Sequence, residues 1–138
     1  MMRYVLKKIH ELCGDIGLAS ILRSPEELAI ELADGVVLHF RNPNKEEDCL
    51  AQFEGTPWHT HGDFIFVDSH GHEIEMSCLN VVSGLAEGQI LVCEKWKRGE
   101  LVDRWLDHQD YVGPFHLSEE GDEVRIWGVS RQIPSSSS

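Results

Sequence analysis

The sequence predicts an α+β fold: a mainly antiparallel, hairpin-rich, curved sheet with an N-terminal helix and one short additional helix. Three observations predict this class. Apolar residues near the start of the chain recur every three or four positions, which is the period of an amphipathic helix. Further on, short apolar runs are separated by turn residues of the kind that close β-hairpins. Because hairpin follows hairpin, the strands should pair antiparallel, with the helices covering one face of the sheet.

Two helices are expected. The first covers residues 3–13, where apolar side chains recur at helical spacing, and Gly14 follows at the expected C-cap position. The second is short and runs from Cys78 past Leu85 to an end near Gly88. Gly84 weakens this second helix, because glycine is a poor helix former.

The segment from Ser24 to Leu32 is ambiguous. Ser24-Pro25-Glu26-Glu27 matches a helix capping box with proline at the first helical position. Residues 28–32, however, alternate as a strand does, up to an Asp34-Gly35 turn. We interpret the segment as a hairpin that pairs residues 28–32 with 36–41, because β-branched and aromatic residues dominate after the turn.

The rest of the chain is predicted as one helical stretch and three more hairpins. Asn42-Pro43 opens a polar, acidic stretch that is expected to make one or two helical turns ending near Phe53. The remaining hairpins pair residues 63–68 with 72–76, residues 89–97 with 100–107, and residues 115–118 with 123–129.

Length and composition predict one domain. At 138 residues and 41% hydrophobic, the chain has enough apolar surface for one core. We expect that domain to span residues 1–134 and residues 135–138 to form a disordered serine tail. The N-terminus lacks the pattern of a secretory signal and no apolar run approaches the length of a membrane span, so a cytoplasmic protein is expected.

Four widely spaced cysteines are expected to be free, buried thiols that behave as small apolar side chains. They show no pair with the CxxC spacing of a zinc or redox motif. The residues are Cys13, Cys49, Cys78 and Cys93.

The charge argues against some partners and in favour of others. Twelve Lys and Arg against 24 Asp and Glu give a net charge of −12, which repels nucleic acid and anionic membrane surfaces. The acids cluster at Glu46-Glu47-Asp48 and again between Glu100 and Glu123. Such clusters serve either as a solubilising surface or as an electrostatic attraction for a basic protein partner.

The densest group of candidate site residues lies between Trp58 and Asp63. In an extended chain, residues two apart point to the same face, so His59 and His61 can present two imidazoles together. Two imidazoles make half of a metal site, and a tryptophan beside them offers an aromatic anchor for a partner. We therefore predict a loop in which Trp58, His59, His61 and Asp63 bind a ligand, with His59 and His61 as candidate metal ligands. The structural alternative is that Trp58 is core and the histidines satisfy backbone carbonyls.

A second pair, His70 and His72, gives the region a recognisable spacing. His59-x-His61-Gly62, seven residues, then His70-x-x-Glu73 resembles the JAMM-type zinc metalloprotease signature, HxHP, seven residues, then S-x-x-D. The chain departs from that signature at Gly62, His70 and Glu73. A strand of about six residues between the pairs would also separate them by about 20 Å, so one metal is not expected to use both.

Two function classes follow. The one we favour is a non-catalytic interaction domain that binds a basic partner and needs no cofactor. In size, acidity and α+β class the chain resembles small bacterial immunity proteins, which implies a role in neutralising or regulating such a partner. The alternative is a metal-dependent hydrolase or other small enzyme that uses zinc or another divalent metal at His59 and His61.

Overall fold

The computed structural model describes residues 6–42, 49–67, 70–111 and 121–129. Within them the chain forms two helices and ten strands, which confirms the predicted α+β class. In chain order these are α1 (Leu6–Ile16), β1 (Ala19–Ser24), β2 (Glu27–Ala33), β3 (Val36–Arg41), β4 (Leu50–Phe53), β5 (His59–His61), β6 (Phe64–Val67), β7 (Glu73–Met76), α2 (Cys78–Glu87), β8 (Ile90–Lys97), β9 (Glu100–His108) and β10 (Asp122–Trp127).

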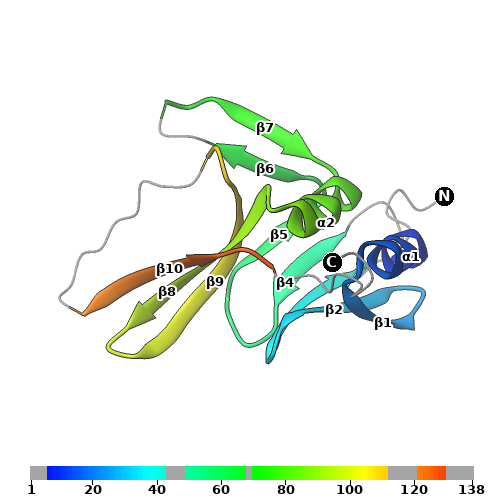
Figure 1. The fold of residues 1–138 in the computed structure, drawn as a ribbon, viewed down its shortest axis with the longest axis horizontal. Coiled ribbons are helices and arrows are strands. Elements are labelled where there is room, and N and C mark those ends of the chain that lie inside the picture. The colour runs from blue at the N-terminus through cyan, green and yellow to red at the C-terminus, as the bar shows by residue number, and fades with distance from the viewer. Residues whose placement is uncertain (1–5, 43–48, 68–69, 112–120, 130–138) are drawn as a thin grey trace, which may run out of the picture.

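The strands form three antiparallel sheets. β1 to β5 make a five-stranded meander in chain order, β6 and β7 make a hairpin, and β8 lies between β10 and β9 in the third sheet. Figure 1 shows the β6–β7 hairpin at the top and the three-stranded sheet extending to the left, away from the helices. α1 packs against β1, β2 and α2, and α2 also contacts β8.

The core lies between the helices and the inward face of the five-stranded sheet. Alternate residues of β2 and β3, including Leu28, Ile30, Leu38 and Phe40, are fully buried. Burying a side chain of this size stabilises the fold by about 1.5–3 kcal/mol. The same period of two sends the intervening residues of β3 to the outer face, which is why His39 and Arg41 reach solvent.

Both predicted helices exist, but the first ends later than expected. α1 continues through Gly14 to Ile16, and the turn after it is closed by Gly17, whose φ is 81°. The prediction of a C-cap at Gly14 is therefore wrong. α2 ends as predicted at Gly88, which adopts a left-handed conformation and donates its backbone N–H to the carbonyl of Gly84.

Gly84 is explained by packing. A Cβ at this position would lie 2.7 Å from Cγ1 of Ile90, which is fully buried at the start of β8. The sequence shows only the poor helix propensity of glycine, whereas the structure shows that glycine lets α2 approach β8 closely.

The ambiguous segment after Ser24 is a strand. Ser24 and Pro25 lie at a turn between β1 and β2, where the Ser24 hydroxyl accepts a hydrogen bond from the N–H of Glu26 at 3.2 Å. The serine therefore stabilises a hairpin turn instead of starting a helix. The hairpin of β2 and β3 across Asp34-Gly35 is confirmed, and β1 is an additional strand that the sequence pattern did not reveal.

The helical turns predicted to end near Phe53 are wrong for the part that the structure describes. Leu50–Phe53 forms β4 and pairs with β3, with Phe53 opposite Leu38. Phe53 is fully buried, so its ladder hydrogen bonds and core contacts together outweigh the local polar composition. The preceding residues 43–48 lie outside the described residues.

Two further hairpins are confirmed, and the last is only partly visible. β6 pairs with β7, and β8 pairs with β9 across a turn at Arg98 and Gly99. The predicted strand after residue 122 exists as β10, which pairs with β8. Its expected partner at residues 115–118 and the serine tail lie outside the described residues.

All four cysteines are free and buried, as predicted. The thiols of Cys49 and Cys78 lie 3.9 Å apart. Burial raises the pKa of Cys13 to about 11 and that of Cys93 to about 12, which keeps both as neutral thiols. In the part of the chain described, neither helix is long and apolar enough to cross a membrane.

Candidate functional site

A pocket of about 330 Å³ lies where the edges of the three sheets meet, and we call it the junction pocket. β5 is the edge of the five-stranded sheet, β9 is an edge of the three-stranded sheet, and β6 belongs to the hairpin. The pocket is lined by Trp58, His59, Thr60, Phe64, Ile65, Phe66, Val67, Leu106 and Asp107. It therefore brings two of the predicted binding residues, Trp58 and His59, together with an acid that the sequence did not single out.

Trp58 is held at the pocket by both its ring and its backbone. The indole packs against Phe53 and Phe64, with ring centroids 5.9 and 6.3 Å away. Its backbone N–H donates to Oδ1 of Asp103 at 3.0 Å, and this oxygen also accepts from the N–H of Arg104. Asp103, which lies on β9, thus connects that strand by a hydrogen bond to the segment before β5. The ring is half-buried, so Trp58 belongs to the edge of the core and to the pocket at once.

His59 and His61 lie on a strand, which corrects the prediction of a loop. β5 pairs with β4, with His59 opposite Gln52 and His61 opposite Leu50. Residues two apart on a strand share a face, and the two imidazole centroids are accordingly 5.5 Å apart with nearly perpendicular rings. Nδ1 of His59 lies 3.1 Å from the carbonyl oxygen of Pro57, a partner of the kind that the structural alternative expected.

The other two predicted binding residues lie beside the pocket. His61 is exposed, Asp63 is half-buried just before β6, and neither lines the junction pocket. His70 and His72 lie between β6 and β7, with ring centroids 6.3 Å apart. β6 runs between the two histidine pairs as an extended strand, as predicted.

The described ranges contain no group of three or more His, Cys, Asp or Glu side chains placed to hold a metal ion. Between the two histidine pairs that carry the resemblance to the JAMM-type signature, the structure has the strand β6. Binding of zinc or another divalent metal by His59 and His61 stays a prediction, and such a site would need at least one further ligand.

Asp107 is the residue that the sequence missed. It is half-buried near the end of β9, and its Oδ1 accepts the backbone N–H of His108 at 2.9 Å. Burial raises the pKa of Asp107 to about 6, opposed by this hydrogen bond and by the neighbouring imidazole of His108. The other ionisable groups nearby are His59 on the same pocket wall and Cys93 on β8. In the sequence, Asp107 is one of eight acids between Glu100 and Glu123, and nothing local distinguishes it.

The raised pKa predicts how Asp107→Asn changes stability. The folded-state value, about 6, lies above the ordinary value of 3.8, so the ionised carboxylate disfavours the native state. This cost is absent in acid, grows as the pH rises from about 3.8 to about 6, and is fully present above that. We expect the variant to melt roughly 2 °C higher than the wild type at pH 8, because solvent screening leaves well under 1 kcal/mol. The two should melt alike at pH 4.

Thermal unfolding at several pH values measures this, with Asp34→Asn as the control. Asp34 is exposed in the turn between β2 and β3, and Asn-Gly closes such a turn as well as Asp-Gly does. A melting temperature of Asp107→Asn that is lower than wild type at pH 8 would contradict the prediction.

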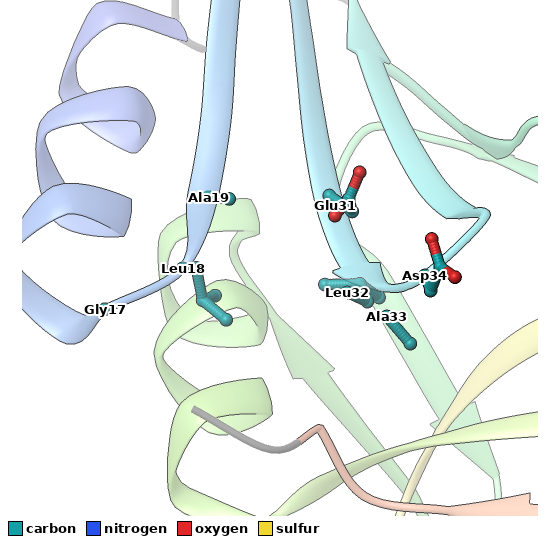
Figure 2. Close-up of a pocket in the computed structure, with 7 residues that line it drawn as sticks. All are labelled: Gly17, Leu18, Ala19, Glu31, Leu32, Ala33 and Asp34. Atoms are coloured by element: carbon teal, nitrogen blue, oxygen red, sulfur yellow. The ribbon is translucent and has the colours of Figure 1, made fainter. Parts of the chain in front are cut away.

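Two other pockets have a different character. Figure 2 shows one of about 430 Å³ between the start of β1 and the end of β2, where the carboxylates are the exposed side chains of Glu31 and Asp34. A pocket of about 230 Å³ on the outer face of the five-stranded sheet includes His39 and Glu54, whose side chains lie 3.1 Å apart. Of the three, the junction pocket is the one with several aromatic lining residues and with a carboxylate whose pKa burial raises to about 6.

Comparison with known proteins adds no relative from which a site could be transferred: no family model, no curated protein and no solved structure matches this chain.

Proposed function

We propose that this protein is a small acidic interaction domain that binds a basic protein partner at the junction pocket and thereby neutralises or regulates it. The observation that carries the proposal is a half-buried carboxylate, Asp107, in a pocket with an aromatic wall. Such a site offers both shape and charge to a cationic surface. Tight protein interfaces concentrate their energy in aromatic anchors set in partly desolvated pockets.

The rim of the pocket supports docking of a protein. Ile65 and Val67 point outward from β6 and are 59% and 49% exposed, beside the half-buried Trp58. Neighbouring exposed apolar residues next to an aromatic side chain are a feature of interaction surfaces. His59 and His61, exposed on the adjacent edge strand, add polar groups at the border of this apolar rim.

The net charge supports the choice of a basic partner. With −12 charges over the chain, long-range attraction would raise the association rate for a basic protein and repel acidic ones. In size, acidity and α+β class, this arrangement is similar to that of small immunity proteins that neutralise toxins. The alternative, a metal-dependent hydrolase at His59 and His61, becomes an outcome of the same test.

The test compares two matched double substitutions. His59→Gln with His61→Gln changes the pocket border, and His70→Gln with His72→Gln makes the same change between β6 and β7. Glutamine keeps hydrogen-bonding capacity while removing protonation and weakening metal ligation. We expect both variants to melt like the wild type, and only the first to bind an isolated basic partner about fivefold or more weakly.

The partner is sought with the full chain as immobilised bait, and its association rate is then measured at several salt concentrations. We expect that rate to fall by about tenfold or more between low and physiological salt. Salt-independent association, or equal loss in both double variants, would contradict the proposal. Stoichiometric zinc in the untagged protein that disappears in the His59, His61 variant would favour the hydrolase instead.

A further inference from the structure

The junction pocket combines two kinds of surface that suit one type of ligand. Trp58, Phe66 and Leu106 supply apolar walls, and Asp107 supplies a carboxylate within the same lining. A ligand that fits both has an apolar stem and a cationic tip. Lysine and arginine side chains have this construction, since their methylene groups pack on apolar surfaces while the charge reaches a polar partner.

Within the described residues, no Lys or Arg side chain pairs with Asp107, and the basic side chain that acts on its pKa is the imidazole of His108. The ion pairs of Arg23, Arg104 and Arg125 are with Glu27, Glu94 and Glu123, respectively. Asp107 instead accepts the backbone N–H of His108. A partly desolvated carboxylate without a cation is unfavourable in the free protein, so an incoming cation gains more here than at an exposed acid.

The geometry favours an ammonium over a guanidinium. Arginine recognises a carboxylate best with two parallel hydrogen bonds, one to each oxygen. At Asp107 the backbone of His108 already donates to Oδ1, which leaves Oδ2 as the open acceptor. An ammonium is a compact charge that can be satisfied at a single oxygen. A cation near the indole of Trp58 gains further attraction from the ring face.

We propose that the junction pocket binds a lysine side chain of the basic partner, with its methylene stem against Trp58 and Phe66 and its ammonium at Asp107. This inference rests on the proposed function and names the partner chemistry at that site. The pocket in Figure 2 does not offer the same combination, because Glu31 and Asp34 are exposed and the other lining residues are Gly17, Leu18, Ala19, Leu32 and Ala33.

The test uses a short peptide with one central lysine as the probe. Three companion peptides replace that lysine with arginine, with norleucine, or with Nε-acetyllysine. Binding to the full chain is followed by NMR titration, with the Trp58 indole and the amides of Ile65 and Asp107 as reporters. We expect the lysine peptide to shift these signals and to bind about tenfold more tightly than the two uncharged peptides, the effect of one charge-assisted hydrogen bond.

Two variants test whether Asp107 is the carboxylate that binds the lysine ammonium. Asp107→Asn should reduce lysine affinity to that of the norleucine peptide, and Asp34→Asn, which removes one charge elsewhere, should leave it unchanged. Melting curves show that each variant is folded. Equal binding of lysine and acetyllysine, tighter binding of arginine, unchanged binding by Asp107→Asn, or shifts that cluster at Glu31 and Asp34 would each overturn the inference.

Failure of this inference and failure of the proposed function give different results. If the lysine peptide fails but a basic protein still binds with salt dependence and with loss in the His59, His61 variant, the proposed function stands and another contact carries the charge. A different result is that the partner protein associates at a rate that does not depend on salt, while the lysine peptide still needs Asp107 to bind. In that case the pocket recognises lysine, but the proposed function is wrong.

Discussion

Arg104→Met is expected to lower the free energy of unfolding by about 3–5 kcal/mol at neutral pH, because it leaves a buried carboxylate without its cation. Arg104 donates from Nε and Nη2 to Oε2 of Glu94, at 2.8 and 2.7 Å. Both side chains are almost completely buried, with exposed fractions of 9% and 7%. Urea or thermal unfolding of the purified variant measures the loss.

The Glu94 carboxylate depends on several donors. Trp96 donates its indole N–H to Oε1 at 3.1 Å, and Trp127 adds another hydrogen bond. Burial alone would raise the pKa of Glu94, but the hydrogen bonds from Arg104 and Trp96 hold it below its ordinary value. A lowered folded-state pKa means that the pair stabilises the fold above the unfolded pKa and that this contribution is lost in acid. The penalty of Arg104→Met should therefore shrink as the pH falls below about 4.

Two further variants test this explanation. Arg125→Met removes an arginine from the same sheet, where Arg125 is exposed, pairs with Glu123 and lies 4.3 Å from the ring of Trp96. The decrease in the free energy of unfolding should be much smaller for Arg125→Met than for Arg104→Met, because solvent already screens the charge of Arg125. Adding Glu94→Gln to Arg104→Met should recover most of the stability, since the amide oxygen can still accept from the tryptophans. A loss of equal size in Arg104→Met and Arg125→Met would contradict the role given to burial.

Phe64→Ala is expected to cost about 3–5 kcal/mol, because it opens a cavity in the aromatic cluster that supports the junction pocket. Phe64 is 2% exposed, and its ring lies 6.4 Å from Phe40, 6.3 Å from Trp58 and 6.1 Å from Phe66. The variant removes the ring contacts of Phe64 on β6 with Phe40 on β3 and with Trp58 just before β5. Equilibrium unfolding in urea measures the loss.

The neighbouring residue on the same strand is the matched control. Ile65 points outward from β6, so Ile65→Ala should change stability by only about 0.5 kcal/mol. Because Ile65 also lines the junction pocket, the same substitution should weaken binding of the basic partner. If Phe64→Ala and Ile65→Ala destabilised the protein equally, Phe64 would not face the core while Ile65 faces solvent, and the prediction would be wrong.

The sequence by itself determined the fold class and most of the hairpins. Period-two alternation followed by a turn, as in residues 28–35, specifies which side chains face the core, and this signal is local. The same holds for α2, whose N-cap at Ser77 and C-cap at Gly88 are set by neighbours a few residues away. Local signals failed at Leu50–Phe53 and at β5, where strand formation depends on pairing with a strand already in place.

Only the tertiary structure decided the composition of the site. Trp58 and His59 stood out in the sequence because unusual residue types lie close together there. Asp107 did not, since it resembles the seven other acids around it until β9 is placed beside β5 and β6. Its neighbours across the pocket are about 40 to 49 residues away in the chain, and its partial burial and raised pKa follow from that packing. An acid's environment depends on which surfaces exclude water from it, and no local sequence pattern records that.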